Sequence, residues 1–289
     1  MANGKRWATI VAASAAVLGL AAATAPASTA QASGATPRPD HVIIIMMENR
    51  GYNAIIGSSH APYLNSLAER GALFTHSTAI THPSEPNYLA LLSGSTQGVH
   101  DDSCPHTFSG DNLAHQIAAG GGSFVGYSES LPKAGYTGCE KGDYARKHNP
   151  WVNFSDVPAS ANQPYTSFPT DYTKLPTVAW VTPNLQDDMH DGSIQQGDAW
   201  LKKNIDGYVQ WAQAHNSLLI VTWDEDEDNG GNNSIPTIFA GAKVKPGQYA
   251  ERINHYSVLR TLESAYGLAP LGAAAKAMPI TDVWSGSAS

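Results

Sequence analysis

The sequence predicts an α/β fold in which helices cover both faces of a mostly parallel sheet. A continuous β-branched run, His41–Met47 (HVIIIMM), is typical of a strand that is buried on both faces. Short apolar runs then alternate with segments of helical periodicity, which is the pattern of successive βαβ units. Polar clusters follow several of the predicted strands, where ligands bind in open sheets of this kind.

The later elements are predicted in chain order from periodicity and from the residues that end helices. Leu64 and Leu67 lie at helical spacing within 61–71, and Gly71 ends that helix. Further helices are predicted over 84–93, 112–119, 197–215 and 257–266. Short apolar runs bounded by turn residues predict strands over 123–127, 177–181, 218–223 and 235–239. The Gly-, Pro- and Tyr-rich stretch 126–177 predicts an irregular excursion over the surface.

The first 32 residues carry the pattern of a secretory signal peptide. Lys5 and Arg6 precede an apolar, alanine-rich run, and 30–32 (AQA) fits a small-residue cleavage site. We therefore expect cleavage after residue 32, a flexible lead-in over 33–40 and one domain over 41–289. No later segment reaches the ~18 consecutive apolar residues that a spanning helix needs, so we expect a secreted monomer without a stable membrane anchor.

The charge of the chain limits its partners. The formal net charge is −8, and loss of residues 1–32 takes Lys+Arg from 17 to 15 against 25 Asp+Glu, which gives −10. An acidic protein is a poor binder of polyanions through its overall field, and the sequence lacks a basic and aromatic stripe, so nucleic acid is not an expected partner. An anionic substrate would have to be held by local groups such as a metal ion, helix N-termini or a few placed cations.

Cys104 and Cys139 are the only cysteines. In an exported chain, two cysteines are expected to form a disulfide, although a free reactive thiol is the alternative. Closing this loop would stabilise the fold by about 4 kcal/mol in the chain-entropy model.

Oxygen-bearing side chains follow two of the predicted strands. Glu48 and Asn49 come directly after the first strand, and Asp224 and Glu225 follow 218–223. Across neighbouring strands these four side chains would form an all-oxygen site, which suits Ca²⁺, Mg²⁺ or Mn²⁺ better than a thiolate-seeking metal. Taken singly, Glu48 and Asn49 could merely start a turn, and we interpret the rest of the acidic row, 226–228, as a solvated loop.

Two histidines stand near predicted strand ends or helix starts. Asp188 and His190 belong to the cluster NLQDDMHDG, which follows 177–181. His190 among carboxylates could act as an acid or a phosphate ligand, or it could be a structural, salt-bridged histidine. His255 precedes the last predicted helix and could be a surface cap or a second active-site imidazole.

Ser84 begins the predicted helix 84–93 in the stretch THPSEPNYLALLSG. Serine is a frequent helix cap, and proline is tolerated in the first turn. Helix N-termini also bind phosphate, and a serine hydroxyl beside a metal can be deprotonated and attack phosphorus. The residues by themselves favour the cap and leave the nucleophile open.

Six ordered motifs resemble the phosphoesterases of the alkaline-phosphatase superfamily, which include secreted acid phosphatases and bacterial phospholipases C. These motifs are IIMMENRGYNAIIG, THPSEPNYLALLSG, TPNLQDDMHDGS, GDAWL, VTWDEDE and HYSVLRTLE, and they span residues 41–268. The resemblance implies a three-layer αβα sandwich around a mostly parallel sheet. The short chain and the motif THPSEPNYLA are more similar to small secreted acid phosphatases, including those that act on phosphoinositides, than to the phospholipases C.

The resemblance also implies roles for individual residues. It makes Ser84 the nucleophile that is transiently phosphorylated in a metal-dependent hydrolysis of phosphate monoesters, with a small molecule or a lipid headgroup as the ester. The ligands of one divalent cation would be Glu48, Asn49, Asp224 and Glu225. Asn87 and Asp188 would bind substrate, and His190 and His255 would bind phosphate or donate protons. The alternatives are a phosphodiesterase of the phospholipase C kind and a non-catalytic exported module that binds phosphate.

Overall fold

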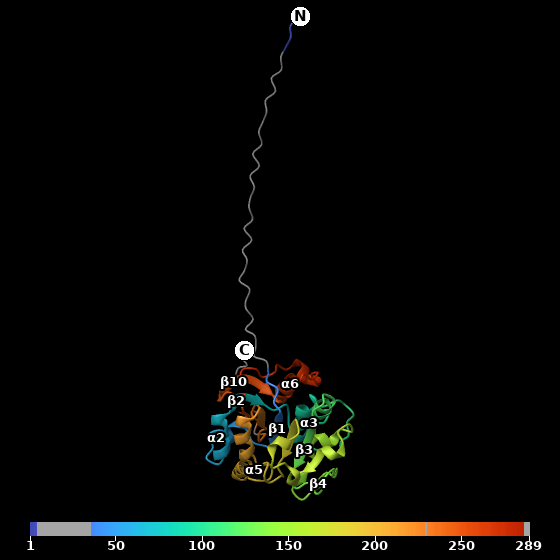
Figure 1. The fold of residues 1–289 in the computed structure, drawn as a ribbon, viewed down its shortest axis with the longest axis vertical. Helices are drawn as coiled ribbons and strands as arrows, with labels where there is room; N and C mark the ends of the chain where they lie inside the picture. The colour runs from blue at the N-terminus through green and yellow to red at the C-terminus, as the bar shows by residue number, and fades with distance from the viewer. Residues whose placement is uncertain (5–35, 229, 286–289) are drawn as a thin grey trace. The chain divides into compact units, whose positions relative to one another are not determined.

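An eight-stranded sheet organises the structure, a computed structural model that describes residues 1–4, 36–228 and 230–285 (Figure 1). Most of the predicted signal peptide and lead-in lies outside the described residues. The strand order is β10–β2–β9–β8–β1–β7–β3–β6. The strands are β1 (His41–Met47), β2 (Ala72–Thr78), β3 (Phe124–Ser128), β6 (Asn162–Pro164), β7 (Val178–Thr182), β8 (Ser217–Trp223), β9 (Thr237–Gly241) and β10 (Gly247–Asn254). Neighbouring strands are parallel except at β9, which runs antiparallel to β8 and β2, so the predicted mostly parallel sheet is confirmed.

Helices lie on both faces of this sheet. They are α1 (Tyr52–Ile55), α2 (Pro62–Arg70), α3 (Ser84–Ser93), α4 (Leu113–Ala119), α5 (Ile194–Ala214) and α6 (His255–Tyr266). Among the described residues, no helix combines the length and the apolar character needed to cross a bilayer.

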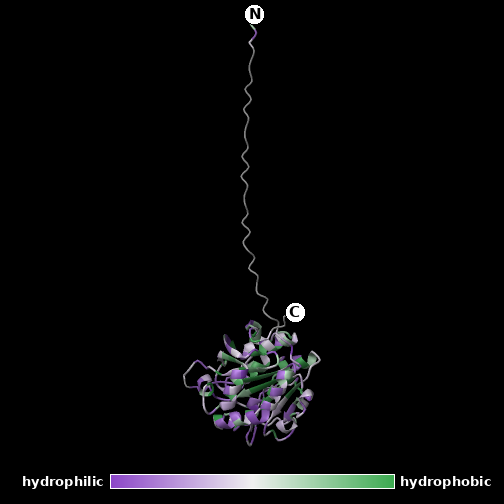
Figure 2. Cartoon of the chain, turned by 60° about the vertical axis from the view of Figure 1, so that its left-hand side comes forward, coloured by the Kyte–Doolittle hydropathy of each residue, from purple (hydrophilic) through white to green (hydrophobic). Residues whose placement is uncertain are grey.

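Alternating residues of β1 feed two separate hydrophobic cores, which makes the fold a three-layer sandwich. Ile44 and Met46 belong to one core together with residues of α3, α4 and α6. Ile45 and Met47 belong to the other, with residues of α2 and α5. A strand covered on both faces has no solvent-facing side, and this explains the uninterrupted apolar run. Figure 2 shows the same arrangement, with green apolar strands inside and purple polar segments outside.

The excursion predicted over 126–177 is irregular, as expected. Between β3 and β7 it contains short elements: β4 (Glu140–Lys141), β5 (Tyr144–Ala145), η1 (Arg146–His148), η2 (Pro150–Asn153), η3 (Ala159–Ala161), β6, η4 (Tyr165–Ser167) and η5 (Tyr172–Lys174). A last 3₁₀ helix, η6 (Gly272–Lys276), follows α6. The predicted pairing of Cys104 with Cys139 is present and ties this excursion to the loop between α3 and α4.

Three strands of the eight-stranded sheet were not expected from the sequence: β2, β10 and the three-residue β6. β2 (ALFTHST) pairs with β9 and β10, and β10 (GQYAERIN) lies at the edge of the sheet beside β2. Most residues of β10 are at least partly exposed, so it contains polar residues and lacks a continuous apolar run. Edge strands of this composition carry little of the hydrophobic pattern from which strands are predicted.

Asp198 fastens the start of α2 to α5. Its carboxylate is buried and accepts hydrogen bonds from the backbone N–H groups of Tyr63 (3.1 Å) and Leu64 (2.8 Å), which have no partner inside α2. We expect Asp198→Ala to lower the free energy of unfolding by about 2 kcal/mol, because two buried donors lose a charged acceptor. Urea denaturation would measure this, with the exposed Asp171→Ala as control; equal stability of the two variants would contradict the assignment.

Candidate active site

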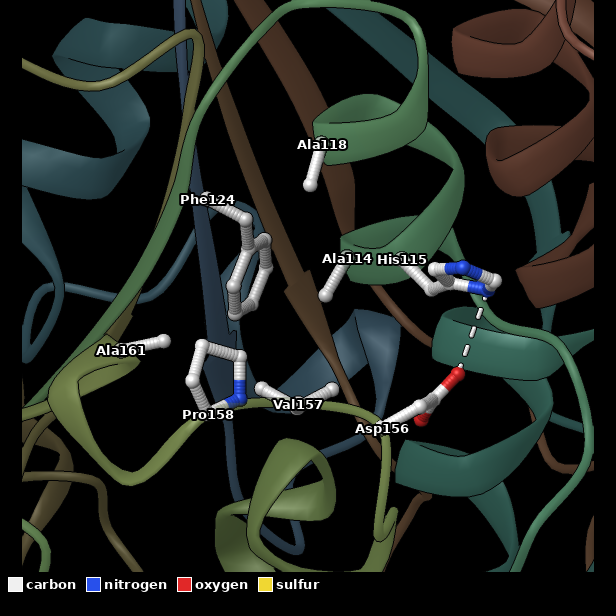
Figure 3. Close-up of a pocket in the computed structure, with 8 residues that line it drawn as sticks. All are labelled: Ala114, His115, Ala118, Phe124, Asp156, Val157, Pro158 and Ala161. Atoms are coloured by element: carbon white, nitrogen blue, oxygen red, sulfur yellow. Dashed lines mark ion pairs between the residues drawn. The ribbon is translucent and has the colours of Figure 1, made fainter.

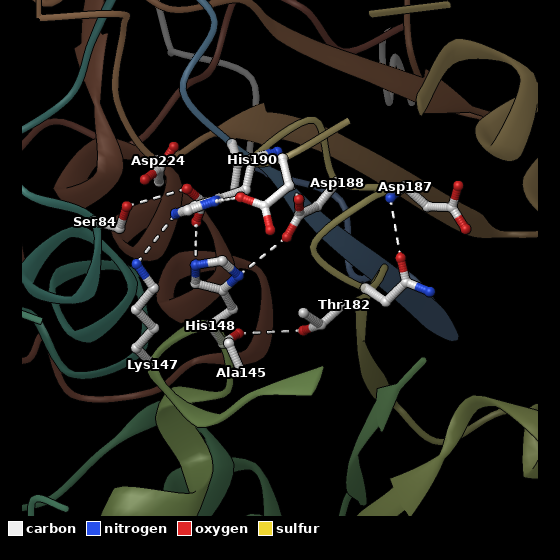
Figure 4. Close-up of polar contacts among 12 residues, drawn as sticks. Ser84, Ala145, Lys147, His148, Thr182, Asp187, Asp188, His190 and Asp224 are labelled. Carbon is white, nitrogen blue, oxygen red and sulfur yellow. Dashed lines mark hydrogen bonds and ion pairs between the residues drawn. The ribbon is translucent and has the colours of Figure 1, made fainter. Parts of the chain in front are cut away.

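Three strands deliver polar residues to one edge of the sheet. β1 is parallel to both β7 and β8, so their carboxyl ends meet at the same edge. The Glu48 N–H donates to the Asp188 carbonyl (2.9 Å), and the Asp224 N–H donates to the Met47 carbonyl (2.9 Å). The sequence prediction that these clusters come together is confirmed (Figure 4).

Ser84 joins this edge from the helix side of the site. Its buried hydroxyl lies 3.0 Å from Glu48 Oε2 and 3.3 Å from Glu225 Oε1, and its proton can be donated to either oxygen. The cap interpretation is wrong: Pro83 is the N-cap of α3, and Ser84 is the first helical residue. The hydroxyl is therefore directed at carboxylates instead of at the backbone of its own helix.

The three carboxylates beside Ser84 repel one another in a buried setting. Burial, followed by the charges of Glu48 and Glu225, raises the pKa of Asp224 well above its ordinary value. Burial and the Glu48 charge also raise the pKa of Glu225, to about 8. Asp224 Oδ1 accepts from the Asn49 N–H (3.0 Å), but its buried Oδ2 has no partner. An orphaned oxygen among crowded carboxylates fits a divalent cation, which would relieve the repulsion.

Asn49 is at the turn that follows β1. Its backbone has φ of 53°, a left-handed conformation that asparagine tolerates better than most residues. This turn directs its N–H at Asp224, and its carbonyl accepts from Arg50 (2.7 Å). Its side chain as a metal ligand stays a prediction.

His148 is the main site residue that the sequence did not reveal. It is buried between two carboxylates, with Nε2 2.9 Å from Glu48 Oε1 and Nδ1 3.0 Å from Asp188 Oδ2. Its ring stacks on Tyr88, whose hydroxyl donates to Glu48 Oε1 (2.7 Å). Burial lowers the pKa of His148, but the Glu48 charge and the Asp188 hydrogen bond outweigh this effect and raise it to about 9. In turn, burial raises the pKa of Glu48, but His148 and Tyr88 bring it down to about 2.

His190 lies at the outer side of the same cluster. Its Nδ1 lies 2.7 Å from Asp191 Oδ1, and its Nε2 lies 3.2 Å from Lys147 Nζ. Because an ammonium can only donate, Nε2 accepts and Nδ1 carries the proton in this arrangement. His190 also has a ring nitrogen within 4.8 Å of ligating atoms of Glu48 and His148, so these three residues form another possible donor set for a metal.

Asp188 positions the two histidines. It is completely buried; Oδ2 contacts His148, and Oδ1 accepts from the His190 N–H (2.8 Å). Both carboxylate oxygens are thus occupied by the protein. In this structure Asp188 holds His148 and His190 in place. This differs from the substrate-binding role that the sequence resemblance implied.

Asn87 is likewise occupied by its own loop. Its Oδ1 accepts from the N–H groups of Ile80 (3.0 Å) and Thr81 (3.1 Å), and its Nδ2 donates to the carbonyls of Thr81 (2.9 Å) and Pro83 (3.2 Å). All four hydrogen-bonding positions of the amide are used. The geometry therefore assigns Asn87 to shaping the loop before Ser84 and leaves no free group for the predicted phosphate contact.

His255 is not placed to supply protons. It is buried at the start of α6, and its Nε2 donates to the Asp224 carbonyl (2.9 Å). Burial lowers the pKa of His255 to about 4, although that hydrogen bond opposes the shift. In this structure His255 supports the strand end that carries Asp224 instead of acting as the predicted proton donor.

A second group of possible metal-ligating side chains occurs at the start of α4. His115 Nδ1 lies 2.9 Å from Asp111 Oδ1 and 3.2 Å from Asp156 Oδ2. Figure 3 shows His115 and Asp156 beside a mainly apolar pocket whose lining includes Phe124 and Val157. These ion pairs are exposed, so they contribute little to stability, and none of the predicted site residues lines this pocket.

The sequence is similar to that of known phosphatases, which is consistent with a phosphate-binding site at this position. The model of the Phosphoesterase family matches residues 58–269. The chain is 52% identical to a phosphatidylinositol-3-phosphatase of Mycobacterium tuberculosis, over 88% of this chain and 85% of that protein. It is 33% identical to a probable acid phosphatase of Kluyveromyces lactis and 31% identical to an acid phosphatase of Aspergillus fumigatus, over 79% of this chain and 58% and 55% of those longer proteins.

Solved structures share the fold. A protein in the alkaline phosphatase superfamily from Vibrio parahaemolyticus superposes with a TM-score of 0.55 at 14% identity, covering 82% of this chain and 69% of that one. A phosphonate monoester hydrolase of Agrobacterium radiobacter gives 0.53 at 15% identity, with coverages of 81% and 74%. The fold is therefore that of the alkaline-phosphatase superfamily. The chain belongs to the Phosphoesterase family and is a phosphoric ester hydrolase.

Proposed function

We propose that this protein hydrolyses phosphate monoesters through a phosphoserine at Ser84, with a divalent cation bound beside it. The observation that carries the proposal is the Ser84 hydroxyl, which faces Glu48 and Glu225 at the start of a helix, next to the unpartnered oxygen of Asp224. A hydroxyl held among carboxylates at a helix N-terminus is suited to attack an anionic phosphorus centre.

The proposed cation would be held by Glu48, Asp224 and Glu225, with Asn49 as the further predicted ligand. Such an ion supplies electrostatic stabilisation of a bound phosphate and lowers the pKa of a nearby hydroxyl. The donor set is all oxygen, which favours Ca²⁺, Mg²⁺ or Mn²⁺. His148 holds Glu48 in place from the opposite side, and Asp188 in turn orients His148.

The chemistry then runs in two displacements. The Ser84 proton leaves along its hydrogen bonds to the carboxylates, the bond from Oγ to phosphorus forms, and the bond from phosphorus to the alcohol oxygen breaks. His190, which lies beside Asp191 at the outer side of the cluster, is the group proposed to protonate the departing alcohol. Water next attacks the phosphoserine and gives up a proton to neutral His190. The bond from Oγ to phosphorus breaks, orthophosphate leaves, and the carboxylates return the proton to Ser84 Oγ.

We further propose that the natural substrates include phosphoinositides and that the protein is exported. The first proposal is supported by the phosphatidylinositol-3-phosphatase relative, which is 52% identical over most of both chains. The second is supported by the signal-peptide pattern of residues 1–32, with its cleavage site at 30–32.

Matched substrates test this function and its metal requirement together. We expect orthophosphate release from an aryl phosphate and from phosphatidylinositol 3-phosphate, and no phosphocholine release from phosphatidylcholine. Chelation should reduce turnover by at least about 100-fold, because the clustered carboxylates would repel the substrate, and one of Ca²⁺, Mg²⁺ or Mn²⁺ should restore it.

Three results would contradict this proposal. Release of phosphocholine in preference to orthophosphate would identify the phospholipase C alternative. Stoichiometric phosphate binding without product would identify a binding module. Full activity after exhaustive chelation would remove the cation from the mechanism.

A further inference from the structure

Lys147 contributes an ammonium group to the site that the mechanism above does not use. It belongs to η1, and its Nζ lies 2.8 Å from Asp102 Oδ2 and 3.2 Å from His190 Nε2. Figure 4 shows it directed toward His190. Its side chain is 19% exposed, so it is restrained without being sealed from solvent. Two of its three N–H donors have protein partners, and one is left for a ligand.

Two chains of contacts join this ammonium to Ser84. In the first, Asp102 accepts from Lys147 through Oδ2 and from the Glu85 N–H through Oδ1 (3.0 Å), and Glu85 directly follows Ser84. In the second, Lys147 contacts His190, which has a ring nitrogen within 4.8 Å of a Glu48 oxygen, and Glu48 accepts from Ser84. The Lys147 ammonium is therefore held beside the start of α3, where the phosphate would bind.

The surrounding loops are fastened before any substrate arrives. The disulfide links Cys104, two residues beyond Asp102, to Cys139 in the excursion. The buried Arg146 guanidinium donates to the carbonyls of Thr137 (2.7 Å) and His106 (2.8 Å), and Arg146 directly precedes Lys147. Both halves of the Lys147–Asp102 pair are thus built on a cross-linked frame, so the ammonium is preorganised.

The other cations at the site have different tasks. His148 uses both ring nitrogens on Glu48 and Asp188. Arg50 donates to the carbonyls of Asn49 (2.7 Å) and Gly192 (3.3 Å). Lys147 differs from both because it contacts His190 inside the cluster, is partly exposed and keeps one uncommitted donor.

We propose that Lys147 makes this site prefer phosphate monoesters over diesters, an inference that rests on the proposed function. A monoester presents three non-bridging oxygens and up to two negative charges near neutral pH, whereas a diester presents two oxygens and one charge. The ammonium can pair with the third oxygen of a monoester. In a diester that third oxygen carries an alkyl group and is therefore a poor hydrogen-bond acceptor. The alkyl group would also shield the Lys147 ammonium from solvent without giving it a new partner.

The test compares Lys147→Met with the wild-type protein on 4-nitrophenyl phosphate and on bis(4-nitrophenyl) phosphate. We expect kcat/KM for the monoester to fall about 100-fold and kcat/KM for the diester to change less than about 3-fold. Inhibition by orthophosphate should weaken at least about 10-fold, while inhibition by dimethyl phosphate should stay the same. Lys147→Arg should recover part of the monoester rate, and Asp102→Asn should give an intermediate loss because the ammonium loses its anchor.

Lys174→Met, which removes a well-exposed ammonium elsewhere, serves as the matched control. The inference is overturned if Lys147→Met lowers kcat/KM equally for the monoester and the diester, or lowers it for neither. It is also overturned if inhibition by orthophosphate and inhibition by dimethyl phosphate weaken to the same extent. These results differ from a failure of the proposed function itself, in which the wild-type protein would release no orthophosphate from the monoester.

Discussion

Ser84→Ala should reduce turnover of an aryl phosphate by at least about 10³-fold and leave the fold intact. The substitution removes the only proposed nucleophile, and alanine is well tolerated at the first position of a helix. Both carboxylates that accept from Ser84 keep other partners. Glu48 retains the Tyr88 hydroxyl and His148, and Glu225 retains His82, whose Nδ1 lies 2.7 Å from Glu225 Oε2. Loss of activity would therefore report the chemistry and not collapse of the site.

Rapid acid quenching of the wild-type protein with substrate provides an independent readout. Mass spectrometry of the digested protein should find phosphate on the peptide that contains Ser84, and the Ser84→Ala protein should give none. Ser66→Ala, at an exposed position of α2, is the matched control and should keep full activity. Wild-type turnover by Ser84→Ala, or a phosphorylated residue elsewhere in the wild-type protein, would refute the assignment.

His148→Ala should lower the free energy of unfolding of the chelated protein by about 3–5 kcal/mol and also abolish activity. The cost is large because Glu48 and Asp188 are both buried and both contact this imidazolium. Its removal leaves two carboxylates close together without their shared cation, and it also removes the ring that stacks on Tyr88. Guanidinium denaturation of the chelated protein measures this loss.

The same buried pair predicts how stability depends on pH in the chelated protein. The pKa of His148 is raised from 6.5 to about 9, so its contribution is complete below pH 6.5 and is lost as the pH rises through 9. The pKa of Glu48 is lowered from 4.5 to about 2, so its contribution is present above pH 4.5 and is lost as the pH falls toward 2. The stabilisation from this pair should therefore be greatest between pH 4.5 and 6.5.

Two comparisons make the His148 prediction specific. His76→Ala, at an exposed position of β2, should leave stability nearly unchanged. His148→Ala should also lose the decline in stability that the wild-type protein shows above neutral pH. A His148→Ala protein as stable as the wild type, or one with the same alkaline decline, would show that His148 is not the buried cation of the site.

Much of the fold was predictable because its driving forces are local. The apolar run His41–Met47 predicts a strand that is buried on both faces, and α3 occupies the predicted range 84–93. The edge strand β10 was missed because most of its residues are at least partly exposed and Ile253 is its one buried residue. Its place is decided by pairing with β2, a contact that its own residues do not indicate.

The candidate site divides in the same way. Glu48 and Asp224 could be found because each directly follows a strand that the sequence predicts. Parallel pairing of these strands brings their carboxyl ends together. His148 and Lys147 could not, because they belong to an irregular excursion whose path no periodicity describes. Their partners are distant in sequence, with 40 residues separating His148 from Asp188 and 45 separating Lys147 from Asp102.

The α/β class, the oxygen-rich strand ends and the helix that begins at Ser84 can be predicted from residues that are close together in the chain. Which groups are free to react is instead set by the tertiary structure. It turned the Ser84 hydroxyl from a presumed cap toward Glu48 and Glu225, and it occupied Asn87 within its own loop. It also surrounded His148 with carboxylates, because burial and charge at a site arise from segments that meet only after folding.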